Sequence, residues 1–261
     1  MIAPANLLQW TAVQPMGVGL VVLGVPAVVL TWAGVVLVRL ALADTPPAET
    51  VVSTKAGYLA ETYALLLGML LVAALAEFQD MQTTVAAEAG KLAAIRSLAS
   101  GLDPGDRAAW RGAIGAYAHA VAEQEWPELA LGGHSAAADR ALDRLFELLG
   151  RTPAPPGSAA AIVLPRVGEL LQAVVDHRAA RITNGPPDAA EGHLGRALLV
   201  LTVLAIAVPW FLRSANLLVH LVLAGLLTLA YIGLIVMAVD LFYPFAGGMH
   251  LGPEPLALLS G

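Results

Sequence analysis

Four long runs of apolar residues divide the chain, with polar residues between them. The runs cover about residues 17–39, 57–77, 194–213 and 217–240, and each ends at a charged residue: Arg39, Glu77, Arg213 and Asp240. Each is close to the ~20 residues that a helix needs to cross ~30 Å of hydrocarbon. The Leu, Ile and Val residues of the fourth run together favour insertion by roughly 4 to 8 kcal/mol. The pattern therefore predicts four transmembrane helices.

The long segment between the second and third runs, residues 78–193, has a different pattern. Residues 78–196 hold 11 of the 14 basic and 14 of the 20 acidic residues of the chain. Apolar residues recur there at spacings of three and four, which is typical of amphipathic helices. The stretches with this spacing are 85–100, 107–124, 136–149 and 165–182. We predict an all-α membrane protein, a single unit over residues 1–261, with a helical soluble domain inserted between the second and third transmembrane helices.

Composition supports a membrane protein and excludes several kinds of site. Charged residues make up 13% of the chain, about half the roughly 25% found in soluble domains. The chain has no cysteine, which excludes disulfides, thiolate metal sites and cysteine nucleophiles. A net charge of -6 without any Lys/Arg cluster argues against a nucleic-acid partner. No Lys or Arg occurs in the first 38 residues, so we do not expect a cleaved signal peptide.

Polar residues at the end of the second run are the first candidates for contact with ions. Residues at spacings of three and four form one stripe: Glu77, Asp80, Thr84, Glu88 and Lys91. Repeated around an oligomer axis, such a stripe makes carboxylate rings, which favour cations. The alternative is an ordinary interfacial helix end in which Glu88 pairs with Lys91 and Arg96.

Leucines within the second run suggest a narrow part of a pore. Leu67, Leu71 and Leu75 could form an apolar neck that gates by dewetting. The neighbouring row of Leu66, Leu70 and Ala74 has the same spacing. Packing against lipid or other helices explains either row equally well.

No pattern typical of an enzyme occurs. The six histidines are scattered, and none forms a His-x-x-x-His or Glu-x-x-His pair. A Gly-rich phosphate loop and a Gly-x-Ser-x-Gly turn are both absent from the sequence. We expect no catalytic residues, no metal site and no cofactor.

Several motifs, in a fixed order, resemble the bestrophin-like family of bacterial membrane proteins. They are the helix from Leu75 to Leu98, Tyr117, Glu125-Trp126-Pro127, Leu164 to Val167, Asp176-His177-Arg178, Tyr243 to Gly247 and Pro253-Glu254-Pro255. The resemblance implies a homo-oligomeric ion channel, usually a pentamer, whose second transmembrane helix lines the pore. The sequence departs from the family pattern at Asp240. Similar proteins place an acidic residue closer to the Pro-Phe pair, which here is Pro244-Phe245.

These expectations define the partners and the location. The resemblance implies a lipid bilayer and inorganic ions as partners, with ion selectivity undetermined. Basic residues flanking the membrane do not decide the orientation, because three lie on each side. The resemblance and the lack of a signal peptide favour the cell inner membrane, with the insert and both termini cytoplasmic. The alternative function is a non-conducting membrane scaffold or sensor whose insert binds a partner or ligand.

Overall fold

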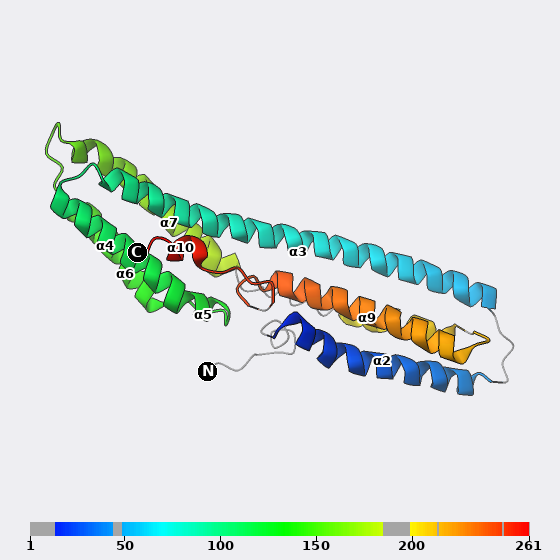
Figure 1. Cartoon of the computed structure of the whole chain (residues 1–261). Coiled ribbons are helices and arrows are strands. Elements are labelled where there is room, and N and C mark those ends of the chain that lie inside the picture. The colour runs from blue at the N-terminus through cyan, green and yellow to red at the C-terminus, as the bar shows by residue number, and fades with distance from the viewer. Residues whose placement is uncertain (1–13, 44–48, 185–198, 213, 247, 261) are drawn as a thin grey trace.

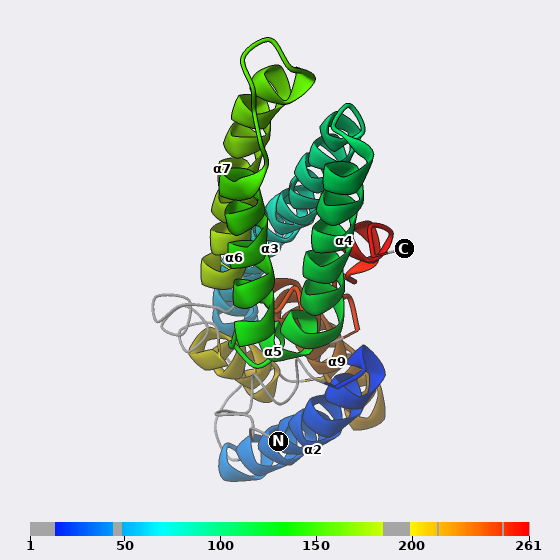
Figure 2. The same ribbon diagram turned by 90° about the vertical axis from the view of Figure 1, so that its left-hand side faces the viewer.

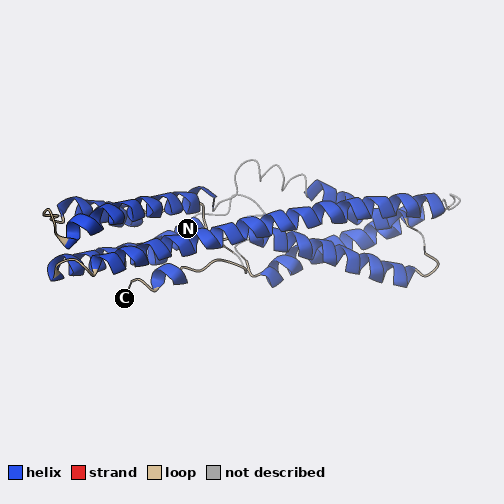
Figure 3. Ribbon diagram, turned by 90° about the horizontal axis from the view of Figure 1, so that it is seen from above, coloured by secondary structure: helices blue, strands red, loops and turns tan. Residues whose placement is uncertain are grey.

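The computed structural model describes residues 14–43, 49–184, 199–212, 214–246 and 248–260. Within these ranges every regular element is a helix and none is a strand (Figure 3). The molecule is elongated, and the helix α3, Glu49–Ala99, runs along most of its length (Figure 1). The all-helical fold predicted from the spacing of apolar residues is therefore confirmed.

One half of the molecule is built from apolar helices. Three helices are long and apolar enough to cross a membrane: α2 (Met16–Ala41), α3 over Ser53–Ala99, and α9 (Leu217–Phe242). The third predicted span is helical over Leu199–Phe211, and its last turn is the 3-10 helix η2, Val208–Phe211. This length is short of a full crossing. Residues 194–198 lie outside the described residues, so the third predicted span, 194–213, stays a prediction.

Tryptophan rings packed on glycines join the apolar helices. The indole of Trp210 covers Gly34 of α2, where any Cβ would overlap the ring. The indole of Trp32 lies against Gly225 of α9, and its N–H donates to the Leu221 carbonyl oxygen at 2.8 Å. Small residues allow such close helix approach in membranes. Gly34 therefore allows η2 to pack closely against α2.

The other half of the molecule is a bundle of amphipathic helices around the far half of α3. These helices are α4 (Pro104–Ala120), the π-helix η1 (Val121–Glu125), α5 (Trp126–Leu129), α6 (Ala136–Arg151) and α7 (Ala159–Asn184). Figure 2 shows α4, α6 and α7 together, away from α2. The helix α6 begins where the Ser135 hydroxyl accepts a hydrogen bond from the Ala137 amide. Each of the four predicted amphipathic stretches is helical.

The core of this bundle is apolar and includes the end of the chain. Fully buried side chains from several helices meet in it: Leu92, Ile95, Trp110, Ile114, Leu145 and Leu171. After α9 the chain returns to the bundle and forms the short helix α10, Glu254–Ala257 (Figure 1). Leu256 of α10 is fully buried in the bundle core. The C-terminal segment therefore connects α9 to the bundle of amphipathic helices.

Candidate functional site

One face of α3 turns away from α7 and α9 and is exposed along its apolar half. Leu65, Met69 and Val72 are 66%, 64% and 70% exposed. The same face continues through Ala76, Asp80 and Thr83, all exposed and at spacings of three and four residues. We call these six residues the exposed stripe of α3.

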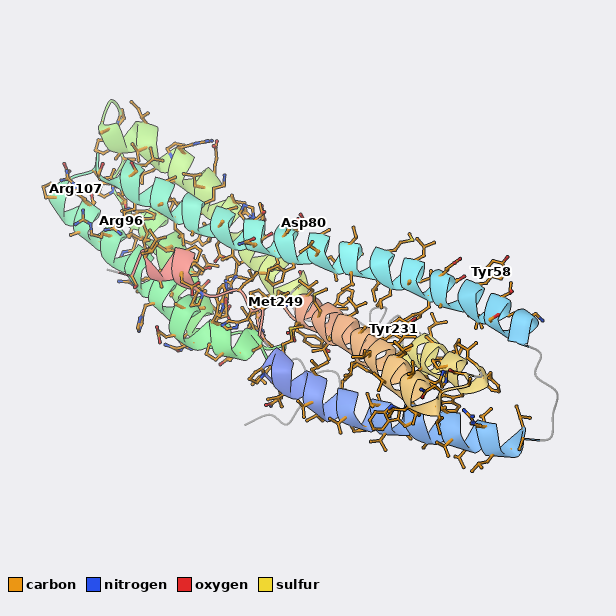
Figure 4. All side chains as sticks on the ribbon, turned by 45° about the vertical axis from the view of Figure 1, so that its right-hand side comes forward. Tyr58, Asp80, Arg96, Arg107, Tyr231 and Met249 are labelled. Atoms are coloured by element: carbon orange, nitrogen blue, oxygen red, sulfur yellow. The ribbon has the colours of Figure 1, made fainter. Side chains whose placement is uncertain are left out.

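The exposed stripe includes the carboxylate of Asp80, and Glu77 lies beside it on α3. Glu77 and Asp80 are both exposed, and neither forms an ion pair among the described residues. Figure 4 places Asp80 near the middle of α3, where the apolar half meets the bundle. No Lys or Arg occurs between Lys55 and Lys91. Residues 56–90 of α3 therefore carry negative charge and no basic residue.

The predicted leucine neck does not form one exposed row in the single chain. Leu67 is 1% exposed and packs in a cluster with Tyr63 and α9 residues, and Leu71 lies half-buried against the same cluster. Leu75 is exposed. The exposed row is offset around the helix to Leu65, Met69 and Val72, because the contact with α9 determines which apolar side chains are covered.

The residues of the predicted polar stripe also do not share one exposed face of α3. Thr84 is half-buried and donates to the Asp80 carbonyl oxygen at 2.9 Å. Glu88 is fully buried in the bundle and is therefore not on the exposed face with Glu77 and Asp80. It pairs with Arg181, and neither Lys91 nor Arg96 pairs with it in the described part of the chain.

A buried ion cluster surrounds Glu88. Arg181 donates from Nε to Glu88 Oε2 at 2.9 Å and from Nη2 to Glu88 Oε1 at 3.2 Å. The Tyr117 hydroxyl donates to Glu88 Oε1 at 2.7 Å. Two nitrogens of one guanidinium on one carboxylate form a bidentate pair, the strongest common geometry of this kind. The cluster thus connects α3, α4 and α7.

Glu125 extends the cluster to a second arginine. Its Oε1 lies 2.9 Å from Arg181 Nη2, and Arg178 donates to both of its oxygens. Arg178 also lies 2.7 Å from Asp139 Oδ1. Glu125 ends the π-helix η1 just before Pro127, which has no N–H to donate and crowds the carbonyl four residues earlier. The wider turn places Glu125 inside the bundle.

Burial and charge shift the pKa values of this cluster in defined directions. Burial alone lowers the pKa of both arginines, but the facing Glu125 and Glu88 carboxylates raise it by more. The net pKa of Arg178 and Arg181 is therefore raised. Burial, reinforced by the negative charge of Glu88, raises the pKa of the Tyr117 hydroxyl well above its ordinary value. The arginines remain charged and the phenol remains neutral.

Trp126 connects the ion cluster to the C-terminal segment. The Arg181 guanidinium lies 5.2 Å from the centre of its ring, a cation–π contact. The indole N–H donates to the Leu251 carbonyl oxygen at 2.8 Å, and Phe245 meets the ring edge-on at 5.3 Å. The segment after α9 is thus fixed to the same residues that hold α3 and α7.

The described residues contain no cluster of candidate metal ligands. No group of three or more His, Asp or Glu side chains converges among them. Asp240 is 1% exposed near the end of α9, beside Gly248. The arrangement consists of an exposed helix face and a closed, charge-paired cluster.

The family assignment follows from a comparison of the sequence. A family model described as the bestrophin-like domain matches residues 21–256. The chain belongs to the bestrophin-like domain family. This membership relates it distantly to the bestrophins, which are ion channels. No curated protein and no solved structure matches the chain.

The bestrophin-like motifs meet in space. Glu125 and Trp126 of the Glu-Trp-Pro motif, Arg178 and Tyr117 all belong to the ion cluster or touch it. Sequence reasoning missed Arg181, which lies three residues after Arg178 and so on the same side of α7. That spacing was the only signal available, since Glu88 lies 93 residues away in sequence. Together with the three apolar helices, the family indicates a membrane protein.

Proposed function

We propose that this bestrophin-like protein is a homo-oligomeric ion channel in which the exposed stripe of α3 from each subunit lines a central pore. The observation that carries the proposal is the continuous exposed stripe, which runs from apolar side chains to the unpaired carboxylate of Asp80. An ionised carboxylate facing acyl chains is costly, so Asp80 must face water, a headgroup layer or another subunit. A water-filled axis meets this requirement.

The stripe has the parts that conduction needs. Leu65, Met69 and Val72 would form an apolar constriction in a ring of subunits, where pores gate by dewetting. Asp80 lies eight residues beyond Val72, about 12 Å along the helix, and marks the mouth on the insert side. Leu67 and Glu88, buried within one subunit, are not part of this lining.

The charges of α3 favour cations. Glu77 and Asp80 are exposed, and residues 56–90 contain no Lys or Arg. Carboxylates at a pore mouth raise the local concentration of cations. The channel we propose is therefore cation-selective.

Recordings from the purified protein in planar bilayers test the proposal. We expect unitary currents whose reversal potential in a KCl gradient lies toward the K⁺ equilibrium value. Asp80→Asn should lower the single-channel conductance and the cation preference, because it removes one charge from every subunit. Glu169→Gln, which changes an exposed carboxylate on α7, is the matched control and should conduct as the unchanged protein does.

Two results would contradict parts of the proposal separately. Anion-selective currents would overturn the role of Asp80 in selectivity but not the proposal that the protein is an ion channel. Absence of currents from protein that is folded and inserted, together with a monomeric state in detergent, would favour a membrane scaffold or sensor.

A further inference from the structure

A hollow opens on the surface of the bundle, between the start of α4 and the end of α6. The residues that line it are Asp106, Arg144, Glu147, Leu148, Arg151 and Thr152. Its volume is about 270 Å³, close to the ~300 Å³ of the smallest typical ligand pockets. Figure 4 shows Arg107, the neighbour of Asp106, at the end of the bundle farthest from the apolar helices. The hollow therefore lies well away from the exposed stripe of α3.

Two opposite charges face this hollow without meeting. Asp106 and Arg151 both line it, yet neither side chain forms an ion pair or a hydrogen bond within the described part of the chain. The other two charged side chains are already paired, since Arg144 Nη1 donates to Glu147 Oε2 at 3.0 Å. The two carboxylates of the lining balance its two guanidiniums, and one group of each kind is free.

The ends of the two helices explain why these charges come together. Asp106 lies in the first turn of α4 and Arg151 in the last turn of α6, where the helix dipoles favour a negative and a positive charge respectively. Thr152, 7% exposed, joins the two helices: its hydroxyl accepts the Trp110 N–H at 3.2 Å and donates to the Leu148 carbonyl oxygen at 2.7 Å. The backbone that carries both charges is therefore held in place, which lowers the cost of ordering a site.

A ligand that matches this hollow carries one charge of each sign. A carboxylate can accept two parallel N–H bonds from a guanidinium, so it fits Arg151. An ammonium group has only donors, and Asp106 is the free acceptor of the lining. A ligand with a net charge would leave one of these two side chains unpaired, whereas a zwitterion satisfies both. Leu148, half-buried, adds an apolar wall for a short side chain.

We propose that this hollow binds a small zwitterion of the amino-acid class. The carboxylate of the ligand lies on Arg151 and its ammonium group lies on Asp106. Arg144 and Glu147 stay paired with each other and keep the surroundings neutral. The site is independent of the proposed channel, because all of its residues belong to α4, to α6 or to the position directly after α6.

Isothermal titration calorimetry of the full-length protein in detergent tests the site with three probes that share one side chain. L-leucine carries both charges, leucinamide carries only the ammonium group, and N-acetyl-leucine carries only the carboxylate. We expect L-leucine to bind with a Kd below about 10 mM, at least about tenfold more tightly than either analogue. No binding of L-leucine, or equal binding of all three probes, would overturn the proposal.

Two variants test the orientation of the ligand. Arg151→Gln should weaken the binding of L-leucine about tenfold but not that of leucinamide, which has no carboxylate. Asp106→Asn should weaken the binding of L-leucine by a similar factor but not that of N-acetyl-leucine, which has no ammonium group. Loss of binding by the analogue that lacks the matching charge would contradict this orientation.

Matched controls come from α6, outside the hollow. Arg140→Gln and Asp143→Asn remove exposed charges of the same two kinds from residues that do not line it. Both variants should bind L-leucine as the unchanged protein does, and helical circular dichroism verifies that each variant is folded. Equal losses in the control variants would show that the overall charge of the bundle attracts the ligand, and would overturn the proposal.

Discussion

The pairing of Glu88 with Arg181 makes a quantitative prediction about stability. Both side chains are fully buried, and Glu88 accepts three hydrogen bonds, two from Arg181 and one from Tyr117. Removing one partner of a buried pair costs about 3–5 kcal/mol, since the other charge stays buried and uncompensated. We therefore expect Glu88→Leu and Arg181→Met each to lower the free energy of unfolding by about this amount.

The double variant should be much less destabilised than the sum of the single variants. Without Glu88 and Arg181, the remaining pair of Glu125 and Arg178 is still balanced in charge. Replacing a complete buried pair by apolar residues is often close to neutral. With single losses of about 3–5 kcal/mol each, a double-mutant cycle should therefore give a coupling free energy of about 3 kcal/mol or more.

Denaturant unfolding of the full-length protein in detergent, followed by helical circular dichroism, measures this cycle. Arg166 and Glu169 form an exposed pair on the same helix, α7, and serve as the control. Their cycle should give less than about 1 kcal/mol. Additive effects of Glu88→Leu and Arg181→Met would refute the cluster, because uncoupled side chains do not share an ion pair.

Three further predictions concern single side chains. Gly34→Ala should lower the free energy of unfolding by about 1–3 kcal/mol, since its Cβ would overlap an indole ring, whereas Gly68→Ala meets no atom within 4 Å and should change it by less than about 1 kcal/mol. The raised pKa of Tyr117 predicts stability that is retained below about pH 10 and falls above it, because the unfolded chain then loses a proton that the folded chain keeps. Tyr117→Phe should reduce that alkaline loss, measured as unfolding midpoints across pH. Trp126→Phe removes the hydrogen bond to Leu251, and limited proteolysis should then cleave the C-terminal segment faster; unchanged cleavage would show that this bond does not hold the segment.

Local patterns were enough to predict the helices. The spacing of apolar residues predicted the amphipathic stretches, and the stretch from Leu75 to Leu98 was expected to be helical, as it is within α3. Such patterns depend only on neighbouring residues three and four positions apart. The helical fold was therefore readable from the sequence.

Contacts between distant segments were not predictable in the same way. The side of α3 covered by α9 decides that Leu67 is buried and Val72 exposed, although both lie in one uniformly apolar run. Glu88 was placed in an exposed stripe because its partner, Arg181, lies on a helix that the sequence does not pair with α3. The motif residues Glu125 and Arg178 were recognised, but not their contact.

Cysteine accessibility tests the central claim, a pore lined by the exposed stripe of α3, most directly. The chain has no cysteine, so single substitutions provide the only thiols. Val72→Cys lies on the stripe, and Leu37→Cys, equally well exposed on α2, is the control. During bilayer recording, a water-soluble cationic thiol reagent should reduce the current through Val72→Cys and leave that through Leu37→Cys unchanged. A response of Leu37→Cys with none at Val72→Cys would place the conduction path on another helix and contradict the account.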